Sequence, residues 1–345
     1  MNAPDPTPTS TARRKRVPAW LPLVLRLAVV AGLLAWIATR MDARELATTL
    51  ARADPRYLGF AALAVILGQF TAGWRWYRLL VAAGSTWSFG RSFAVYCAGL
   101  FLGLFIPTGV GGDVYRVARV RTSGAGLGRG TATIVLERAI GLLALLILGT
   151  GFVLSQPGTR PWGLLFLVGS LVGLAGLAAL WIPGGPEHVA RVLDRFPGRG
   201  LGNRVRNAFP QDAMTRLHGA IPGTVALSLA NHGWILTANV MLALGLRLPV
   251  SWHAVCAAVP LVLLAAQVPI TPGGTGLREA AYVFFLGRVG VPQTQALALA
   301  LGWFALLVGT GLLAALGLLF DRESGRERGP GVETRTGGTE VPPAR

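Results

Sequence analysis

Cysteine and lysine are nearly absent from this chain. It has two cysteines, Cys97 and Cys256, both in apolar surroundings, and a single lysine, Lys15. Two cysteines so placed provide neither a disulfide framework nor a thiolate metal site, and the four histidines show no ligand spacing. The chain also lacks a Gly-Lys-Ser/Thr triplet, which argues against a built-in ATPase. We therefore expect neither a metal ion nor another cofactor.

Charged residues are scarce as well, at 14% of the chain, whereas hydrophobic residues make up 52%. Several runs of about 20 apolar residues have the length needed to cross a hydrocarbon core of roughly 30 Å. Such repeated runs exclude a soluble enzyme with one long buried helix. A net charge of +17 would suggest nucleic acid as the partner of a soluble protein. Here the arginines lie between apolar spans, so membrane topology and anionic lipid headgroups explain them, and we expect no nucleic-acid partner.

The apolar runs predict an all-α integral membrane protein with about six spanning helices. We expect these helices at 18–39, 57–79, 130–155, 161–183, 220–246 and 293–319. The first run follows a basic tail, 1–17, and is longer than the apolar part of a signal peptide, which favours an uncleaved anchor. The segment 321–345 is rich in glycine, proline and charge, so we expect a disordered tail there.

Two Pro/Gly-rich breaks interrupt the remaining apolar stretches, 91–122 and 250–290. Each break, 106–116 and 269–279, runs into charged residues. Irregular backbone survives within a bilayer only where it is buried in protein or lines a wet cavity. Matched breaks in the two halves of a hydrophobic chain are the best sequence indication of a transport site near the midplane.

Charge counting predicts how these two stretches lie. If each is a re-entrant hairpin and both termini are cytoplasmic, 22 of the 32 Lys and Arg residues fall on the cytoplasmic side and 7 outside. The positive-inside rule favours this orientation. The count places Arg75 in a cytoplasmic segment, 75–91. It also makes the membrane domain, 18–320, an inverted repeat of two halves, 18–155 and 156–319.

Ionisable side chains at membrane depth are costly and are candidates for function. The candidates are Asp113, Arg116, Glu137, Arg138, Arg278 and Glu279. Glu137 and Arg138 are adjacent on a predicted helix and point about 100° apart, so they cannot readily pair with each other. Each is expected to find a partner on another element, and the charged residues of the two predicted hairpins are the obvious candidates. A purely structural salt-bridge network is the alternative.

The glycines of the two breaks complete the predicted binding site. Gly111, Gly112, Gly273 and Gly274 leave backbone N–H groups uncovered at the beginnings of predicted helices, a combination that suits a phosphate. A tight turn with close helix packing is the alternative. We expect the arginines that follow the breaks to hold the phosphate, with the nearby carboxylates as counter-charges.

Four segments resemble a known family in order and spacing. They are 75–80, Gly111-Gly112-Asp113 with Arg116, Glu137-Arg138 with Gly141, and 272–276 with Glu279. Together they resemble the flippase-like membrane domain of lysylphosphatidylglycerol synthases, over about 18 to 320. The resemblance implies a flippase-like role for a phospholipid or a polyprenyl-glycolipid. Aminoacyl transfer is not expected, because only about 25 residues follow the last predicted span.

These observations together predict a multi-pass protein of the cytoplasmic (inner) membrane that is not an enzyme. We expect it to translocate an anionic phospholipid or a polyprenyl-phosphate lipid by exposing a central phosphate site to each leaflet in turn. Two alternatives stay open. One is a scaffold that recruits a lipid-modifying enzyme or a glycosyltransferase, and the other is a membrane-embedded transferase. The sequence predicts no oligomeric state.

Overall fold

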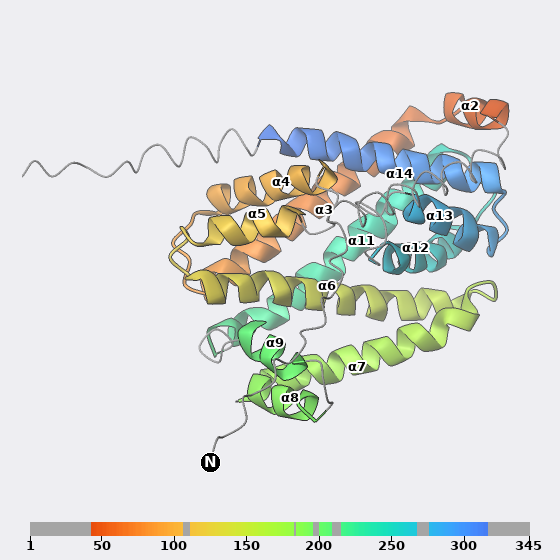
Figure 1. The fold of residues 1–345 in the computed structure, drawn as a ribbon. Coiled ribbons are helices and arrows are strands. Elements are labelled where there is room, and N and C mark those ends of the chain that lie inside the picture. The colour runs from red at the N-terminus through yellow and green to blue at the C-terminus, as the bar shows by residue number, and fades with distance from the viewer. Residues whose placement is uncertain are drawn as a thin grey trace, which may run out of the picture.

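In a computed structural model of the chain, the residues described are 43–105, 111–182, 184–195, 200–208, 215–267 and 276–316. These segments form helices and their connections, without a strand among them (Figure 1). The helices are α2 (Ala43–Ala51), α3 (Pro55–Ala82), α4 (Phe89–Phe105), α5 (Gly111–Val120), α6 (Leu127–Ser155), η1 (Arg160–Trp162), α7 (Gly163–Trp181), α8 (Gly185–Leu193), α9 (Leu201–Ala208), η2 (His218–Ala220), α11 (Ile221–Gly245), α12 (Trp252–Ala266), α13 (Leu277–Gly287) and α14 (Gln293–Ala314).

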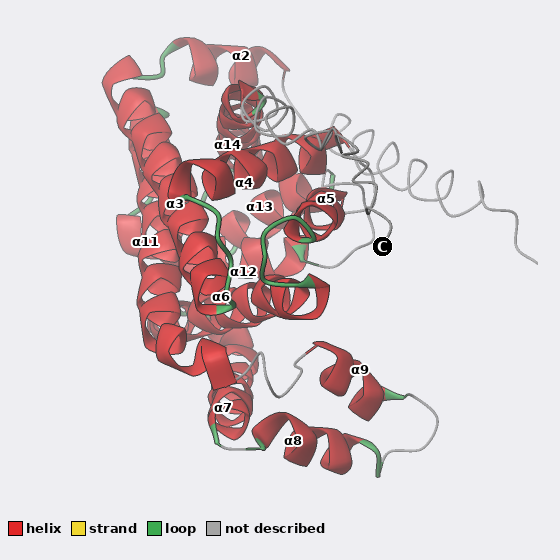
Figure 2. Cartoon of the chain, turned by 90° about the vertical axis from the view of Figure 1, so that its left-hand side faces the viewer, coloured by secondary structure: helices red, strands yellow, loops and turns green. Residues whose placement is uncertain are grey.

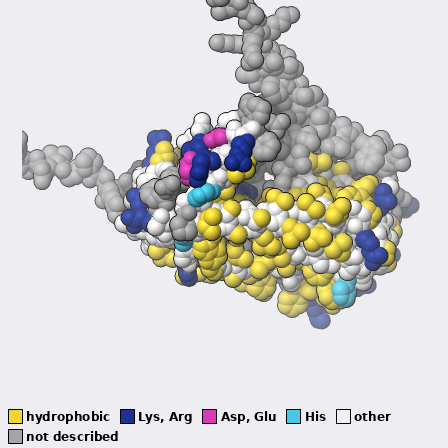
Figure 3. All heavy atoms as spheres, turned by 90° about the horizontal axis from the view of Figure 1, so that it is seen from below, with side chains coloured by type: hydrophobic (Ala, Val, Ile, Leu, Met, Phe, Trp, Pro, Cys, Tyr) yellow, Lys and Arg dark blue, Asp and Glu magenta, His cyan; other side chains and the backbone are white. Residues whose placement is uncertain are grey.

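Within the described residues, five helices are long and apolar enough to cross a membrane: α3, α6, α7 with η1, α11 and α14. The predicted all-α membrane class is therefore confirmed, and these five helices coincide with five of the predicted spans. The remaining predicted span, 18–39, lies outside the described residues, as do the two predicted tails. Large apolar side chains are exposed along α7, among them Leu164 at 68% and Val172 at 66%. Figure 3 shows a broad apolar face on the side of the molecule where α7 lies, a surface suited to lipid rather than to water.

α3 and α11 pack along each other at one side of the bundle (Figure 2). Small side chains explain their close approach: Ala61, Ala64, Gly68 and Ala72 of α3 are all buried and recur at helical spacing. A Cβ atom at Gly68 would lie 3.5 Å from the Cβ atom of Trp234 on α11. Small residues at such intervals let two helix backbones come together where no hydrophobic effect drives association.

Two pairs of shorter helices complete the bundle, α4 with α5 and α12 with α13. The members of each pair pack against each other, and each pair occupies a different half of the bundle length (Figure 1). The order long helix, short pair, long helix occurs twice, as α3 to α6 and as α11 to α14. This arrangement is the one expected of two re-entrant hairpins. Within the predicted breaks, residues 106–110 and 269–275 lie outside the described residues, so the hairpins stay a prediction.

The connections between the helices gather at two ends of the bundle (Figure 1). At one end the α3–α4 connection meets the α5–α6 connection, where the Thr86 N–H donates to the Ser123 carbonyl at 2.8 Å. At the other end the Asp54 N–H before α3 donates to the Gly245 carbonyl of α11, also at 2.8 Å. The charge count assigns the segments at these ends to opposite sides of the membrane, and that assignment stays a prediction. Which of them faces the cytoplasm stays a prediction.

A pair of short helices, α8 and α9, lies at the first of these ends, beside α7 (Figure 2). Arg206 of α9 joins them. Its guanidinium donates to both carboxylate oxygens of Glu187, at 2.9 and 3.0 Å, and to Asp194 at 2.8 Å. The hydrogen bond from Arg206 lowers the pKa of the Glu187 carboxyl below its ordinary value. We call this cluster of Glu187, Asp194 and Arg206 the α8–α9 clasp.

Candidate functional site

Glu137 is buried inside the bundle, between two arginines from other helices. It lies on α6, ten residues after Leu127 and therefore about 15 Å along the helix axis. Nη2 of Arg75, on α3, donates to its Oε1 atom at 2.8 Å. Nη2 of Arg116, on α5, donates to its Oε2 atom. Each carboxylate oxygen thus serves one guanidinium, and a single side chain connects three helices.

The alternation of charge continues from Arg116 to the surface. Nη1 of Arg116 donates to Oδ1 of Asp113 at 3.2 Å. The other oxygen of Asp113 accepts from Nε and Nη2 of Arg138, at 3.0 and 2.7 Å. We call this chain of ion pairs, Arg75–Glu137–Arg116–Asp113–Arg138, the charge ladder. With three arginines and two carboxylates, its formal net charge is +1.

Aromatic and polar side chains enclose the inner part of the ladder. The guanidinium carbon of Arg116 lies 4.2 Å from the ring centroid of Trp76 and 5.4 Å from that of Tyr96, which places the cation over both rings. Nη1 of Arg75 donates to the Ser228 hydroxyl of α11 at 2.9 Å. The Nε–H groups of Arg75 and Arg116 are buried and have no hydrogen-bond partner among the described residues. Two charge-bearing donors are therefore left for a water molecule or a ligand oxygen to satisfy.

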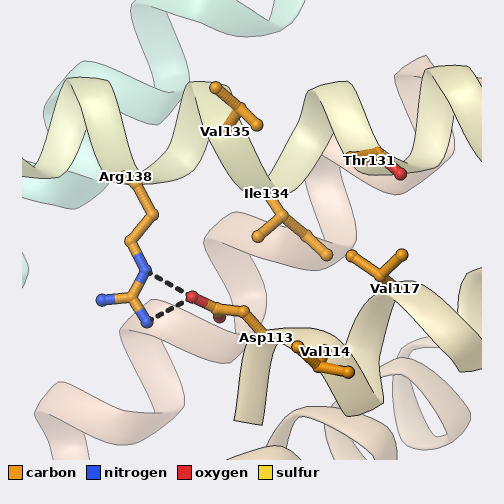
Figure 4. Close-up of a pocket in the computed structure, with 7 residues that line it drawn as sticks. All are labelled: Asp113, Val114, Val117, Thr131, Ile134, Val135 and Arg138. Carbon is orange, nitrogen blue, oxygen red and sulfur yellow. Dashed lines mark hydrogen bonds and ion pairs between the residues drawn. The ribbon is translucent and has the colours of Figure 1, made fainter. Parts of the chain in front are cut away.

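The ladder runs from buried to exposed. The side chains of Glu137 and Arg116 are 4% and 6% exposed, that of Asp113 is 18% exposed and that of Arg138 is 60% exposed. Arg138 and Asp113 lie along a groove between α5 and α6 with a cavity volume of about 390 Å³ (Figure 4). The other residues that line it are Val114, Val117, Thr131, Ile134 and Val135. The outer end of a buried charge network therefore opens into an otherwise apolar groove.

The structure brings together four of the predicted site residues: Asp113, Arg116, Glu137 and Arg138. The expectation that the two adjacent α6 charges pair with the hairpin charges is confirmed, since Glu137 pairs with Arg116 and Arg138 with Asp113. The cost of an unpaired charge at membrane depth explains why both find partners.

The second predicted group of charges lies on α13. Glu279 is buried, and its carboxylate accepts the N–H of Gly276 at 2.5 Å, which satisfies a free backbone donor at the beginning of the helix. Arg278 lies beside it on the same first turn of α13. Farther along, the Tyr282 hydroxyl donates to Asn239 of α11 at 2.6 Å and ties α13 to the bundle. Whether the two predicted groups share one site stays a prediction.

The four glycines that were predicted to offer backbone N–H groups to a phosphate differ in what the structure shows of them. Gly112 lies directly against α4: a Cβ atom there would come within 2.2 Å of the Gly99 carbonyl oxygen. Close helix packing, the alternative that the sequence left open, is therefore an observed role of Gly112. Gly111 is buried at the beginning of α5. Gly273 and Gly274 lie outside the described residues.

Arg75 is the site residue that sequence reasoning missed. The charge count assigned it to a cytoplasmic segment although the predicted span 57–79 includes it, and in the structure α3 continues to Ala82 and buries Arg75 against Glu137. A signal was available in the spacing of α3: Arg75 follows the small buried residue Ala72 by three positions and precedes the buried Leu79 by four. It therefore shares their inward face.

Comparison with known protein families shows to which family the chain belongs. Residues 23–315 match the lysylphosphatidylglycerol synthase TM region family. The chain belongs to this family. The match covers most of the chain and includes the charge ladder, the groove and both short helix pairs, which identifies a multi-pass membrane protein related to lipid synthesis. A search of curated proteins gave no match.

Proposed function

We propose that this member of the family translocates an anionic lipid across the cytoplasmic membrane. The charge ladder is the observation that carries the proposal. An arginine at the centre of a spanning helix costs at least about 2.5–3.5 kcal/mol on insertion scales, and this site holds one more arginine than it has carboxylates. Two buried guanidinium groups, each with an Nε–H donor that has no partner among the described residues, suit a phosphate.

The mechanism follows from competition between carboxylates and phosphate for the same guanidinium groups. In the empty site Asp113 and Glu137 pair with the three arginines and leave a formal charge of +1. An incoming phosphate replaces part of that pairing, so binding favours a different arrangement of α5 relative to α6. We assign Arg116 and Arg278 to hold the phosphate in the two leaflet-facing states, with Glu279 as a further counter-charge. No covalent bond is made or broken, and the protein is then a transporter rather than an enzyme.

A scaffold for a lipid-modifying enzyme or a glycosyltransferase is the competing function. One observation favours it: every carboxylate oxygen of Asp113 and Glu137 is already paired within the chain. Such pairing holds α3, α5 and α6 together, which is all that a scaffold requires of these residues. The two functions differ in what they require of the arginines. A scaffold needs only that the domain folds, whereas a transporter needs the positive charges themselves.

Lipid translocation in proteoliposomes tests the proposal. The variants are Arg116→Ala, Arg278→Ala, Arg278→Lys and Glu279→Gln, each first shown to be monodisperse and folded. Arg116→Ala leaves two intact pairs, Arg75–Glu137 and Asp113–Arg138, so we expect it to fold. We expect strong loss of translocation in both alanine variants, and substantial loss in Arg278→Lys because lysine lacks the planar fork of arginine. Near-normal translocation by both folded alanine variants would reject the phosphate site and favour the scaffold.

A further inference from the structure

We propose that the α4–α5 pair moves as one rigid unit when a phosphate binds, sliding along α3, while the α12–α13 pair stays fixed to the long helices. This inference rests on the proposed function and deepens it by naming the element that moves. The two pairs occupy corresponding places in the order of helices, yet they are held in different ways. The differences lie in the packing inside the first pair, its contact with α3, its ties to α6 and the burial of the second pair.

The packing between α4 and α5 makes the first pair rigid. Gly99 of α4 and Gly112 of α5 lie directly against each other, and a Cβ atom at Gly112 would collide with the Gly99 carbonyl. A Cβ atom at Gly99 would lie 3.0 Å from the Gly112 carbonyl oxygen and 3.1 Å from Cγ of Arg116. Helices packed this closely transmit a displacement instead of absorbing it. A change of position at Arg116 is therefore passed on to α4.

Stacked aromatic rings line the contact of α4 with α3. Phe89, Phe93 and Tyr96 recur at intervals of four and three residues, so they share one face of α4. The Phe93 ring stacks on both neighbours, with centroids 5.4 Å from Phe89 and 6.3 Å from Tyr96, and it lies against Gly73 of α3. The Tyr96 hydroxyl donates to Gln69 of α3 at 2.9 Å. Because the rings are spaced by one helical turn, a slide by one turn brings each ring to the place of its neighbour, and the contact can form again.

The ties of the first pair to α6 are ionic and can be exchanged. Arg116 of α5 donates to Glu137 of α6. Asp113 of α5 accepts from Arg138, also of α6. A phosphate competes with the carboxylates for both guanidinium groups, and each exchange loosens α5 from α6. The groove between these two helices, about 390 Å³ in volume, leaves room for α5 to shift. Phosphate binding thus acts directly on the contacts that hold the first pair in place.

The second pair belongs to the largest apolar cluster among the described residues. All nine residues from Ala254 to Val262 are buried, so every side of this part of α12 is covered. In α4, by contrast, most buried positions recur at intervals of three residues, as on a helix with one covered face. α12 packs against α6, α11 and α13, and α13 packs against α14 (Figure 1).

The tie between α13 and α11 carries no charge. It is the hydrogen bond from the Tyr282 hydroxyl to Asn239, and both residues are fully buried. A phosphate that exchanges partners with guanidinium groups leaves this bond intact. A shift of α12 or α13 would also break up a close-packed core, which is a far larger change than the loss of two exchangeable ion pairs. We therefore assign the second pair to the fixed frame.

Distances between paired spin labels, measured on the full-length protein by double electron–electron resonance, test which pair moves. In a cysteine-free background, one label replaces Val172 of α7, which is 66% exposed. The other replaces Gly90 on α4, Ala118 on α5 or Phe284 on α13, all exposed and outside the groove. The protein is placed in nanodiscs of phosphatidylcholine, without and with phosphatidylglycerol. We expect the anionic lipid to shift the α4 and α5 distances by about 5 Å, one helical turn, and the α13 distance by less than about 2 Å.

Variants that release one tie each are examined in phosphatidylcholine alone, so they need no anionic lipid. Glu137→Gln removes the carboxylate that α5 binds and should shift the α4 and α5 labels. Arg116→Ala, which keeps both neighbouring ion pairs, serves the same purpose if Glu137→Gln does not fold. Arg121→Ala, an exposed arginine just after α5 that is not part of the ladder, is the matched control and should leave every distance unchanged. Tyr282→Phe releases the tie of α13 and should leave the α13 distance unchanged, because burial still holds that helix.

The results separate the moving unit from the proposed function. Equal shifts of the α5 and α13 labels, an α5 label that stays fixed in either test, or a changed distance between labels on α4 and α5 would overturn the inference. A shift confined to α4 and α5, in a protein that transfers no lipid, supports the moving unit and refutes translocation. Lipid transfer with equal shifts of both pairs keeps the proposed function and overturns the moving unit.

Discussion

Glu137→Gln tests whether the ladder is a coupled buried network. The replacement keeps the size of the side chain but removes the charge that faces both Arg75 and Arg116. Glutamine offers one oxygen where two guanidinium groups need an acceptor, and its NH₂ group opposes the other cation. Removing one partner of a buried ion pair costs about 3–5 kcal/mol, because the remaining charge is left uncompensated. With all three side chains less than 10% exposed, we expect the upper part of this range.

The assay is thermal unfolding of the detergent-purified protein, followed by tryptophan fluorescence. We expect Glu137→Gln to lower the unfolding temperature by on the order of 10 °C. Arg138→Ala is the control within the same network, since a pair with an exposed partner contributes at most about 1 kcal/mol. The reasoning is refuted if Glu137→Gln unfolds at the temperature of the unaltered protein, or if Arg138→Ala is equally destabilised.

Three further predictions concern other parts of the molecule. Gly112→Ala places a methyl group within 2.2 Å of a carbonyl oxygen of α4, and we expect it to lower the unfolding temperature, whereas an unchanged value would contradict the observed packing. In a cysteine-free background, an impermeant thiol reagent added to intact cells should label a cysteine at Thr48 and not one at Gly124; the reverse pattern would refute the orientation. The lowered pKa of Glu187 means that its bond with Arg206 stabilises the α8–α9 clasp above the ordinary glutamate pKa and is lost as the pH falls. Hydrogen exchange in α8 and α9, corrected for the pH dependence of the intrinsic exchange rate, should therefore accelerate below about pH 4. A corrected exchange rate that does not change with pH would disprove this coupling.

The spanning helices could be predicted from the sequence because lipid imposes a simple rule of length and apolar composition. The pairing of Glu137 and Arg138 with charges on another element followed from helix geometry alone, since neighbours on a helix point in different directions. Both inferences depend on local properties of the chain. They needed no knowledge of how the helices pack.

The rest depended on tertiary contacts. Arg75 lies 62 residues from Glu137 along the chain, and no local pattern in α3 shows which carboxylate it meets. Gly112 had two physically reasonable roles, and only the position of Gly99 on α4 reveals close packing. Glu279 was predicted as a counter-charge, but whether it also caps its own helix depends on the backbone at Gly276. The groove itself is formed by side chains from two helices, so no single segment of sequence predicts it.

The central claim is that the protein moves an anionic lipid between leaflets through the charge ladder. Its most direct test is the transfer of headgroup-labelled phosphatidylglycerol in proteoliposomes that contain the unaltered protein, Arg116→Ala or Arg121→Ala, beside protein-free vesicles. We predict transfer well above the protein-free rate for the unaltered protein and for Arg121→Ala, and at least about a tenfold loss for Arg116→Ala, equivalent to one charge-assisted hydrogen bond. Transfer by the unaltered protein at the protein-free rate, or equal transfer by folded Arg116→Ala, would contradict the account.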